Sequence, residues 1–185
     1  IKIEPHCGEA YYNLGVALQS KGDSDAAIVS YQKAISLKPE SFNAYSNMGA
    51  ILKENREYDA AITCCEKAIQ IKPDHASAYG NMGAALQEKG EWNAAIKCFK
   101  SALRNKPDYA EAYYNMGNAL EDKGELISAI DSYKQALKIK PDYAEAYYNM
   151  GNVLRSNGDL DAAKHCYKQT LKIKPDNTEA KHLLA

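Results

Sequence analysis

Five asparagines recur at one fixed spacing, and their type and spacing are the strongest chemical signal in the sequence. Each lies 34 residues after the one before it: Asn13, Asn47, Asn81, Asn115 and Asn149. An amide side chain carries both N–H donors and an oxygen acceptor, so a row of them could hold the main chain of an extended peptide. The same row would arise if each amide bonded a neighbouring helix, and both interpretations stay open.

Other polar and aromatic side chains accompany this row in the same repeating positions. They are tyrosines, two further asparagines and four charged residues: Tyr12, Tyr114, Tyr148, Asn118, Asn152, Glu111, Glu145, Lys53 and Arg155. Tyrosine is enriched at protein interfaces because its ring offers flat, amphipathic contact area. Alternatively, these rings pack on the adjacent repeat and leave only the hydroxyl in water. We predict that these residues and the asparagine row line a peptide-binding groove.

The spacing of 34 residues extends through the whole chain. All six prolines share one column: Pro5, Pro39, Pro73, Pro107, Pro141 and Pro175. Residues 107–118 are repeated letter for letter at 141–152. Self-similarity at such a period is typical of stacked supersecondary units, in which each unit packs on its neighbours.

Each period predicts two helices joined by a short turn. In residues 110–143, apolar residues follow the i, i+3, i+4, i+7 rule from Tyr113 to Leu120, which indicates an amphipathic helix. A second helix should end before Pro141, because proline cannot continue a helix. Gly117 and Ala129 are small where the two helices should meet.

The ends of these helices also carry signals. Asp108 is predicted to cap the helix that follows it, with Glu111 as the reciprocal partner, and Asp142 and Asp176 repeat this pattern. Gly124 is expected to end the first helix in a left-handed conformation.

One unit departs from this pattern at its turn. It has Asn55-Arg56 where the others have a residue followed by glycine. We therefore expect either that Asn55 takes the left-handed conformation or that this turn is looser.

We expect an all-α fold in which residues 1–185 form a single solenoid of stacked antiparallel helix hairpins. Residues 1–7 should be the end of a preceding repeat, which suggests a chain cut from a longer array, and 178–185 a capping helix or a truncated sixth repeat. The full units between them are 8–41, 42–75, 76–109, 110–143 and 144–177.

The proline period, the Tyr–Leu/Met–Gly set and the paired alanine columns together resemble the tetratricopeptide repeat (TPR) over nearly the whole chain. The resemblance implies a right-handed superhelix whose first helices line a concave groove for an extended peptide or a partner helix. The arms of O-linked N-acetylglucosamine transferases are similar, because they carry an asparagine ladder along that groove.

Composition excludes several classes of function. The chain has 23 basic and 24 acidic residues, without the cationic surplus of a general nucleic-acid binder. No apolar run approaches a membrane span, and no signal peptide is apparent. The five cysteines are odd in number and lack metal-ligand spacing with the histidines, so we expect reduced thiols, no metal or cofactor, and a reducing intracellular compartment such as the cytoplasm.

The face of the first helices left over from packing is acidic. It carries seven acidic residues and two basic ones: Glu9, Glu54, Glu88, Glu111, Glu121, Asp122 and Glu145 against Lys53 and Arg155. Such a face should favour neutral or basic partners. We find no catalytic motif. We therefore expect a non-catalytic protein–protein interaction scaffold, and keep two alternatives: a substrate-recruiting arm of a larger enzyme such as a glycosyltransferase, and a module that self-associates through its exposed ends.

Overall fold

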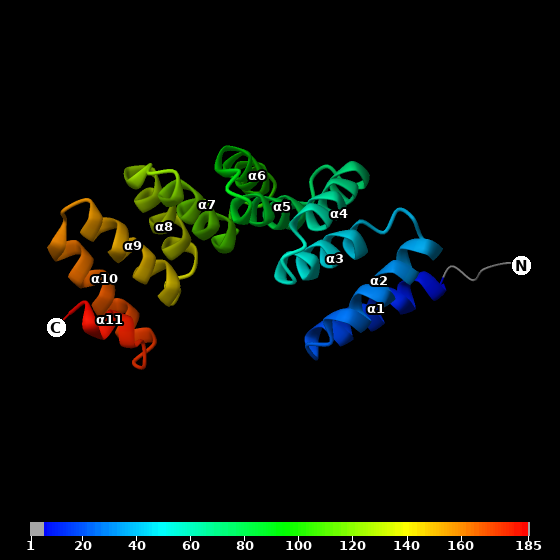
Figure 1. Ribbon diagram of the computed structural model, residues 1–185, viewed down its shortest axis with the longest axis horizontal. Helices are drawn as coiled ribbons and strands as arrows, with labels where there is room; N and C mark the ends of the chain where they lie inside the picture. Colours follow the sequence, from blue (N-terminus) through cyan, green and yellow to red (C-terminus); the bar gives the residue numbers. More distant parts are fainter. Residues whose placement is uncertain (1–5, 185) are drawn as a thin grey trace, which may run out of the picture. The chain divides into compact units, whose positions relative to one another are not determined.

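The computed structural model describes residues 6–184, and all regular structure in that part is helical, as the sequence predicts. The expected end of a preceding repeat at 1–7 lies largely outside the described residues. Figure 1 shows the helices in chain order: α1 (His6–Ser20), α2 (Ser24–Leu37), α3 (Phe42–Glu54), α4 (Tyr58–Ile71), α5 (Ala76–Glu88), α6 (Trp92–Asn105), α7 (Ala110–Asp122), α8 (Leu126–Ile139), α9 (Ala144–Ser156), α10 (Leu160–Ile173) and α11 (Thr178–His182).

Consecutive helices pack as hairpins: α1 with α2, α3 with α4, α5 with α6, α7 with α8, and α9 with α10. Each second helix ends shortly before a proline of the 34-residue column; α8, for example, ends at Ile139, ahead of Pro141. The predicted hairpins and the predicted helix ends at proline are therefore confirmed. The tail forms α11, which packs on α10 and buries Ala180.

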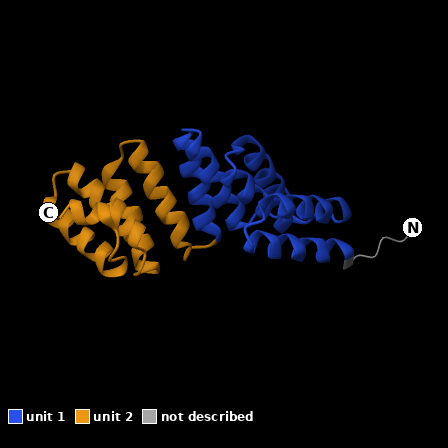
Figure 2. Ribbon diagram, turned by 60° about the horizontal axis from the view of Figure 1, so that its bottom comes forward, with its two compact units in different colours: residues 1–105 blue, residues 106–185 orange. Residues whose placement is uncertain are grey.

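The hairpins group into two compact units, which are coloured separately in Figure 2. Unit 1 comprises residues 1–105 and contains α1 to α6, and unit 2 comprises residues 106–185 and contains α7 to α11. Within unit 1 the first helices α1, α3 and α5 lie side by side, and within unit 2 α7 lies beside α9. That one uninterrupted stack runs from the first hairpin to the last stays a prediction.

Four of the five hairpin turns have a glycine in the left-handed region, with φ between 77° and 87°: Gly22, Gly90, Gly124 and Gly158. In the turn between α3 and α4, Arg56 itself takes this conformation, with φ of 64°, while Asn55 has φ of −74°. The turn is closed by the usual bonds, from Arg56 N to Lys53 O at 3.0 Å and from Glu57 N to Leu52 O at 2.8 Å. Both expected outcomes for this turn are therefore wrong, and Arg56 bears a backbone cost of about 1 kcal/mol.

The predicted aspartate caps are also wrong. Helix α7 begins at Ala110 with Tyr109 as the N-cap residue and no side-chain cap, and α9 begins likewise after Tyr143. Asp108 and Asp142 each lie one residue too early to reach the free N–H groups. In α11 the capping side chain is Asn177, whose Oδ1 accepts from Ala180 N at 2.8 Å, instead of Asp176.

In each hairpin a glycine of the first helix lies against a side chain of the second helix, and in four of the five hairpins that side chain is an aromatic ring. A Cβ atom added to Gly117 would lie 2.5 Å from Tyr133 Cε1, and the Tyr133 side chain is fully buried. Gly83 meets the Phe99 ring in the same way, whereas Gly49 meets the Cys65 thiol. Because this close packing is possible only without a side chain, the glycine column sets how closely the two helices of each hairpin approach.

All five cysteines lie in the described part, and none forms a disulfide. Burial raises the pKa of the Cys65 thiol to about 12 and that of Cys166 to about 11, so these thiols stay protonated at neutral pH. Within residues 6–184 no group of three or more potential ligands is placed to hold a metal ion. No helix of the described chain has the length and apolar character required to cross a bilayer.

Candidate functional site

The predicted site residues of unit 2 come together on the side where α7 lies beside α9. We call this the unit 2 polar face and define it by five side chains: Tyr114, Asn118 and Glu121 of α7, and Asn149 and Asn152 of α9. All five side chains are half-buried. They follow helical spacing along each first helix, so they project to the same side of the hairpins.

Asn149 is bonded to the preceding hairpin through both of its amide hydrogens. Its Nδ2 donates to Tyr114 Oη at 3.0 Å and to Asn118 Oδ1 at 3.0 Å. The Asn149 Oδ1 atom has no hydrogen-bond partner within residues 6–184. The interaction between hairpins therefore orients this amide and leaves its acceptor accessible.

The Asn118 amide has the opposite orientation, with its oxygen toward the neighbouring side chains. Its Oδ1 accepts from Tyr133 Oη at 2.8 Å as well as from Asn149, which leaves its NH₂ group without a partner in the described part of the chain. The pair thus exposes one acceptor, on Asn149, and one donor group, on Asn118. These are the two functions that a peptide unit needs opposite its own N–H and C=O.

The Tyr133 hydroxyl also lies 2.8 Å from Glu121 Oε2, so its single proton has two acceptors. Burial raises the pKa of the Glu121 carboxyl and the charge of Asp122 adds to this, whereas the hydrogen bond from Tyr133 lowers it. Burial and the nearby Glu121 charge likewise raise the pKa of the Tyr133 hydroxyl, which stays protonated.

The next hairpin repeats part of this arrangement. Tyr167 Oη donates to Asn152 Oδ1 at 3.0 Å, and the Tyr148 ring lies 6.1 Å from the Tyr167 ring in a tilted geometry. The Tyr114 ring lies 6.0 Å from that of Tyr133. The predicted groove tyrosines therefore pack against second-helix tyrosines, at distances favourable for aromatic pairs.

The corresponding residues of unit 1 are bonded differently. Asn47 Nδ2 donates to Tyr31 Oη at 3.3 Å, and Tyr12 Oη lies 3.5 Å away at the limit of a hydrogen bond. Asn81 Nδ2 donates to the Ser46 carbonyl at 3.2 Å, and Asn13 is exposed. The positions of Asn118 and Asn152 hold apolar residues in unit 1: Val16, Ala50 and Ala84.

The remaining predicted residues are more peripheral. Asn115 and Lys53 are half-buried, while Glu111, Glu145 and Arg155 are exposed. Glu145 forms an ion pair with Lys174, and this contact lowers the pKa of the Glu145 carboxyl. Part of the negative charge expected on this face is therefore neutralised within the chain.

The sequence interpretation did not include the second-helix tyrosines Tyr31, Tyr133 and Tyr167 among the site residues. Their rings are buried, but their hydroxyls reach the first-helix face and bond the polar groups there. A signal was present, because this column holds tyrosine in three hairpins but Cys65 and Phe99 in the other two. The tyrosine hydroxyl thus identifies the hairpins in which the second helix is hydrogen-bonded to polar side chains of the first helix.

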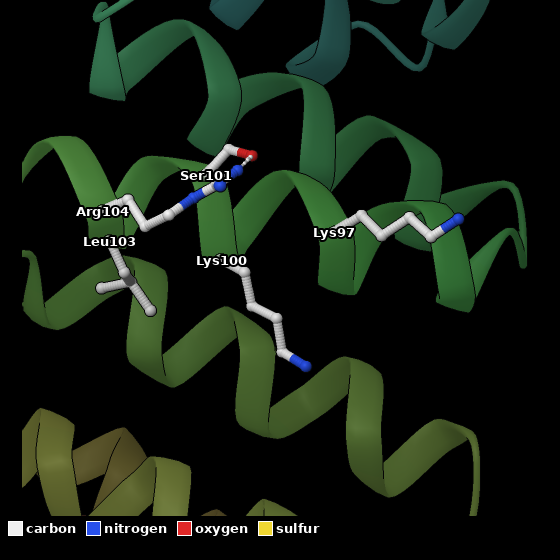
Figure 3. A pocket seen from close by; sticks show the side chains of 5 residues that line it. All are labelled: Lys97, Lys100, Ser101, Leu103 and Arg104. Carbon is white, nitrogen blue, oxygen red and sulfur yellow. Dashed lines mark hydrogen bonds between the residues drawn. The ribbon is translucent and has the colours of Figure 1, made fainter.

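A different surface, beside α6, is basic. A hollow of about 680 Å³ is lined by Lys97, Lys100, Ser101, Leu103 and Arg104. These side chains are drawn in Figure 3, and Arg104 donates to Ser101 Oγ at 2.8 Å. The three cations of the hollow follow one face of a single helix. They lie on a second helix, whereas the predicted asparagine row lies on the first helices, and we assign them no role in the candidate site.

Family models decide what this architecture is. Three models described as tetratricopeptide repeat match residues 8–41 and 144–177, residues 40–108, and residues 98–131, and a fourth, described as TPR repeat, matches residues 117–154. The chain belongs to the tetratricopeptide repeat family. The resemblance stated from the sequence is thereby confirmed for the family, and its similarity to glycosyltransferase arms stays a prediction.

Solved structures of TPR proteins share this fold. The crystal structure of MamA matches with a TM-score of 0.76 and 28% identity, covering 89% of this chain and 96% of MamA. YrrB matches with a TM-score of 0.72 at 23% identity, covering 93% and 89% of the two chains. TTC0263, a thermophilic TPR protein of Thermus thermophilus, matches with a TM-score of 0.76 at 23% identity, covering 95% of each chain.

No curated protein sequence gave a significant match. The four matching models all describe TPR repeats, and none describes a catalytic family. The chain therefore has the architecture of a protein-interaction scaffold.

Proposed function

We propose that this TPR array is a non-catalytic scaffold that binds an extended peptide along its first helices, with the unit 2 polar face as the principal contact. The observation that supports this most directly is the opposed orientation of two amides. Asn149 presents an acceptor and Asn118 a donor, and both are held by bonds to Tyr114, Tyr133 and each other. Groups held in place before binding lose little conformational entropy when the ligand arrives.

These amides would bond the peptide main chain and so hold peptides of varied sequence. A peptide-binding site exists on another protein of this fold, YrrB. The side chains of the ligand would then meet tyrosine rings and carboxylates, which is why we expect neutral or basic partners. Apart from Glu145, which is paired with Lys174, the first-helix acids of unit 2 are Glu111, Glu121 and Asp122, and they outnumber the one cation, Arg155.

The test is a selection of random dodecapeptides displayed on phage against the full chain, followed by affinity measurements with the selected peptides. Changing Asn149→Ala should weaken binding about 5- to 10-fold, because a main-chain N–H would lose its partner. Adding Asn115→Ala should weaken binding further if the row acts as a whole. The control is Asn93→Ala, which removes an exposed amide from α6.

Two results would overturn the proposal. One is a selection that enriches no peptide above an unrelated helical protein. The other is enriched peptides whose affinity is the same for the Asn149→Ala and Asn93→Ala proteins.

A second candidate function is self-association through α1. The Tyr11 and Leu14 side chains are 37% and 47% exposed, whereas Met150, which corresponds to Leu14 in α9, is 8% exposed. An apolar helix face of this kind commonly marks an interaction site. A second copy of the chain that covers it would give a mass by light scattering that rises with concentration.

Leu14→Glu should abolish that rise, because a carboxylate would have to be buried without a partner. Val29→Glu, at a 64% exposed apolar position of α2, should leave it unchanged. A constant monomer mass for the unaltered chain would reject self-association.

The third hypothesis, a recruiting arm of a larger enzyme, depends on the glycosyltransferase resemblance, and a catalytic domain in the same reading frame would support it.

A further inference from the structure

In two hairpins, the residue at the same first-helix position accepts a hydrogen bond from the hydroxyl of the second-helix tyrosine. The accepting group is an amide oxygen in one hairpin and a carboxylate in the other. In the first hairpin, Tyr31 Oη donates to Gln19 Oε1 at 2.8 Å. In the fourth, Tyr133 Oη lies 2.8 Å from Glu121 Oε2. Gln19 and Glu121 are 102 residues apart, which is three periods of 34 residues. A neutral amide oxygen therefore satisfies this hydroxyl as well as a carboxylate does, and the fold has no need of a charge at Glu121.

The charge at Glu121 has a cost that the hydrogen bond from Tyr133 offsets only in part. The side chain is half-buried, and its burial together with the adjacent Asp122 raises the pKa of the carboxyl. No cation of the described chain forms an ion pair with Glu121. Lys123, two residues away, pairs with Glu125 at 2.6 Å instead. A partly desolvated carboxylate without a counter-ion is unfavourable unless a ligand supplies one.

The neighbouring repeat does not supply the missing cation either. Arg155 occupies the position of Glu121 on α9 but is exposed and makes no ion pair with it within residues 6–184. Lys174, another cation near α9, is engaged by Glu145. Glu121 Oε2 is held by Tyr133, while Oε1 has no partner in the described chain.

We propose that Glu121 receives the cationic side chain, arginine or lysine, of the peptide bound on the unit 2 polar face. This inference rests on the proposed function and adds a specificity to it. Glu121 follows Asn118 by three residues, so both project from the same side of α7. A main chain held by the Asn118 and Asn149 amides would carry its side chains past the carboxylate. The bond would be charge-assisted, with Tyr133 fixing the orientation of the acceptor.

The first hairpin also provides a precedent for a matched variant of Glu121. Glu121→Gln should keep the fold and the bond from Tyr133, because Gln19 makes that bond in the first hairpin. The variant removes only the charge. Circular dichroism and a Tm equal to or above that of the unaltered chain would confirm that the fold is kept.

The first measurement needs no peptide ligand. The chain is labelled with carbon-13 at the glutamate carboxyl groups and titrated with N-acetyl-arginine-N-methylamide, and the Glu121 resonance is assigned by its loss in the Glu121→Gln protein. The Glu121 resonance should shift more than that of Glu111, an exposed carboxylate of the same helix. The matched neutral probe, N-acetyl-citrulline-N-methylamide, should shift neither.

The second measurement uses peptides selected on phage. Peptides selected by the unaltered chain should carry an arginine or lysine at one shared position. They should bind the Glu121→Gln protein about tenfold more weakly at low salt. The difference should shrink as sodium chloride is raised, because salt screens a charge pair that remains in contact with water.

The outcomes separate this inference from the proposed function. If peptides are selected without an enriched cation, or bind both proteins equally, and arginine and citrulline probes shift Glu121 equally, the inference is wrong while peptide binding stands. If no peptide is selected at all, the proposed function fails instead.

Discussion

Replacing Tyr133 by alanine is expected to lower the free energy of unfolding of the α7–α8 hairpin by about 3–5 kcal/mol. The Tyr133 side chain is fully buried, and its ring fills the space left by Gly117. Alanine would leave a cavity and would also remove the hydroxyl bonded to Asn118 and Glu121. Because repeat proteins open locally, the loss should appear as faster amide hydrogen exchange in α7 and α8.

Tyr133→Phe is the matched control, and the structure already contains its precedent. Phe99 occupies the same position in the α5–α6 hairpin, where it is fully buried against Gly83. Phenylalanine should therefore fill the same space and lose only the hydroxyl, at a cost of about 1 kcal/mol, because Asn118 and Glu121 can turn to water. If alanine costs no more than phenylalanine, the ring does not carry the stability assigned to it.

Gly117→Ala is expected to destabilise the chain by about 1–3 kcal/mol, although alanine favours a helix over glycine by about 1 kcal/mol. The new Cβ would lie 2.5 Å and 2.7 Å from two ring carbons of Tyr133. The ring is fully buried and its hydroxyl is hydrogen-bonded at the far end, so it cannot move aside without breaking contacts. Urea unfolding followed by circular dichroism measures the loss.

The decisive control is the same change in a chain that already carries Tyr133→Ala. Without the ring, the three atoms nearest to the added Cβ atom are gone, and the helix propensity should dominate. Gly117→Ala should then be neutral or should stabilise the chain by about 1 kcal/mol. The same destabilisation in both backgrounds would show that the ring is not what the glycine accommodates.

Most of the secondary structure is readable from the sequence because its determinants are local. The proline column ends the second helices, and glycine in the left-handed conformation ends the first ones, as Pro141 and Gly124 illustrate. The two exceptions are also local, and in each the relevant residue lies one position away from the one expected. Asp108 misses the cap position by one, and Arg56 keeps a glycine-like conformation because the packed hairpin holds its turn closed.

For the candidate site, the sequence predicts which side chains share a face but not how their amide groups are oriented. Sequence spacing places Asn118, Asn149 and Tyr114 on one face, since helical periodicity sets the direction of a side chain. It does not set which atom of an amide faces inward. In the structure the Asn118 oxygen faces the Tyr133 hydroxyl, which comes from another helix, and the Asn149 NH₂ group faces that same oxygen.

The sequence alone thus determined the family, the helical hairpins and the residues that share a face. Only the tertiary structure decided which side-chain atoms are engaged by neighbouring helices and which remain available to a ligand. It also showed that the uncharged Gln19 and the charged Glu121, at the same position of two hairpins, both accept a hydrogen bond from the second-helix tyrosine. The physical reason is that a helix repeats every 3.6 residues regardless of its surroundings, whereas a hydrogen bond between helices exists only where two packed surfaces bring donor and acceptor within about 3 Å.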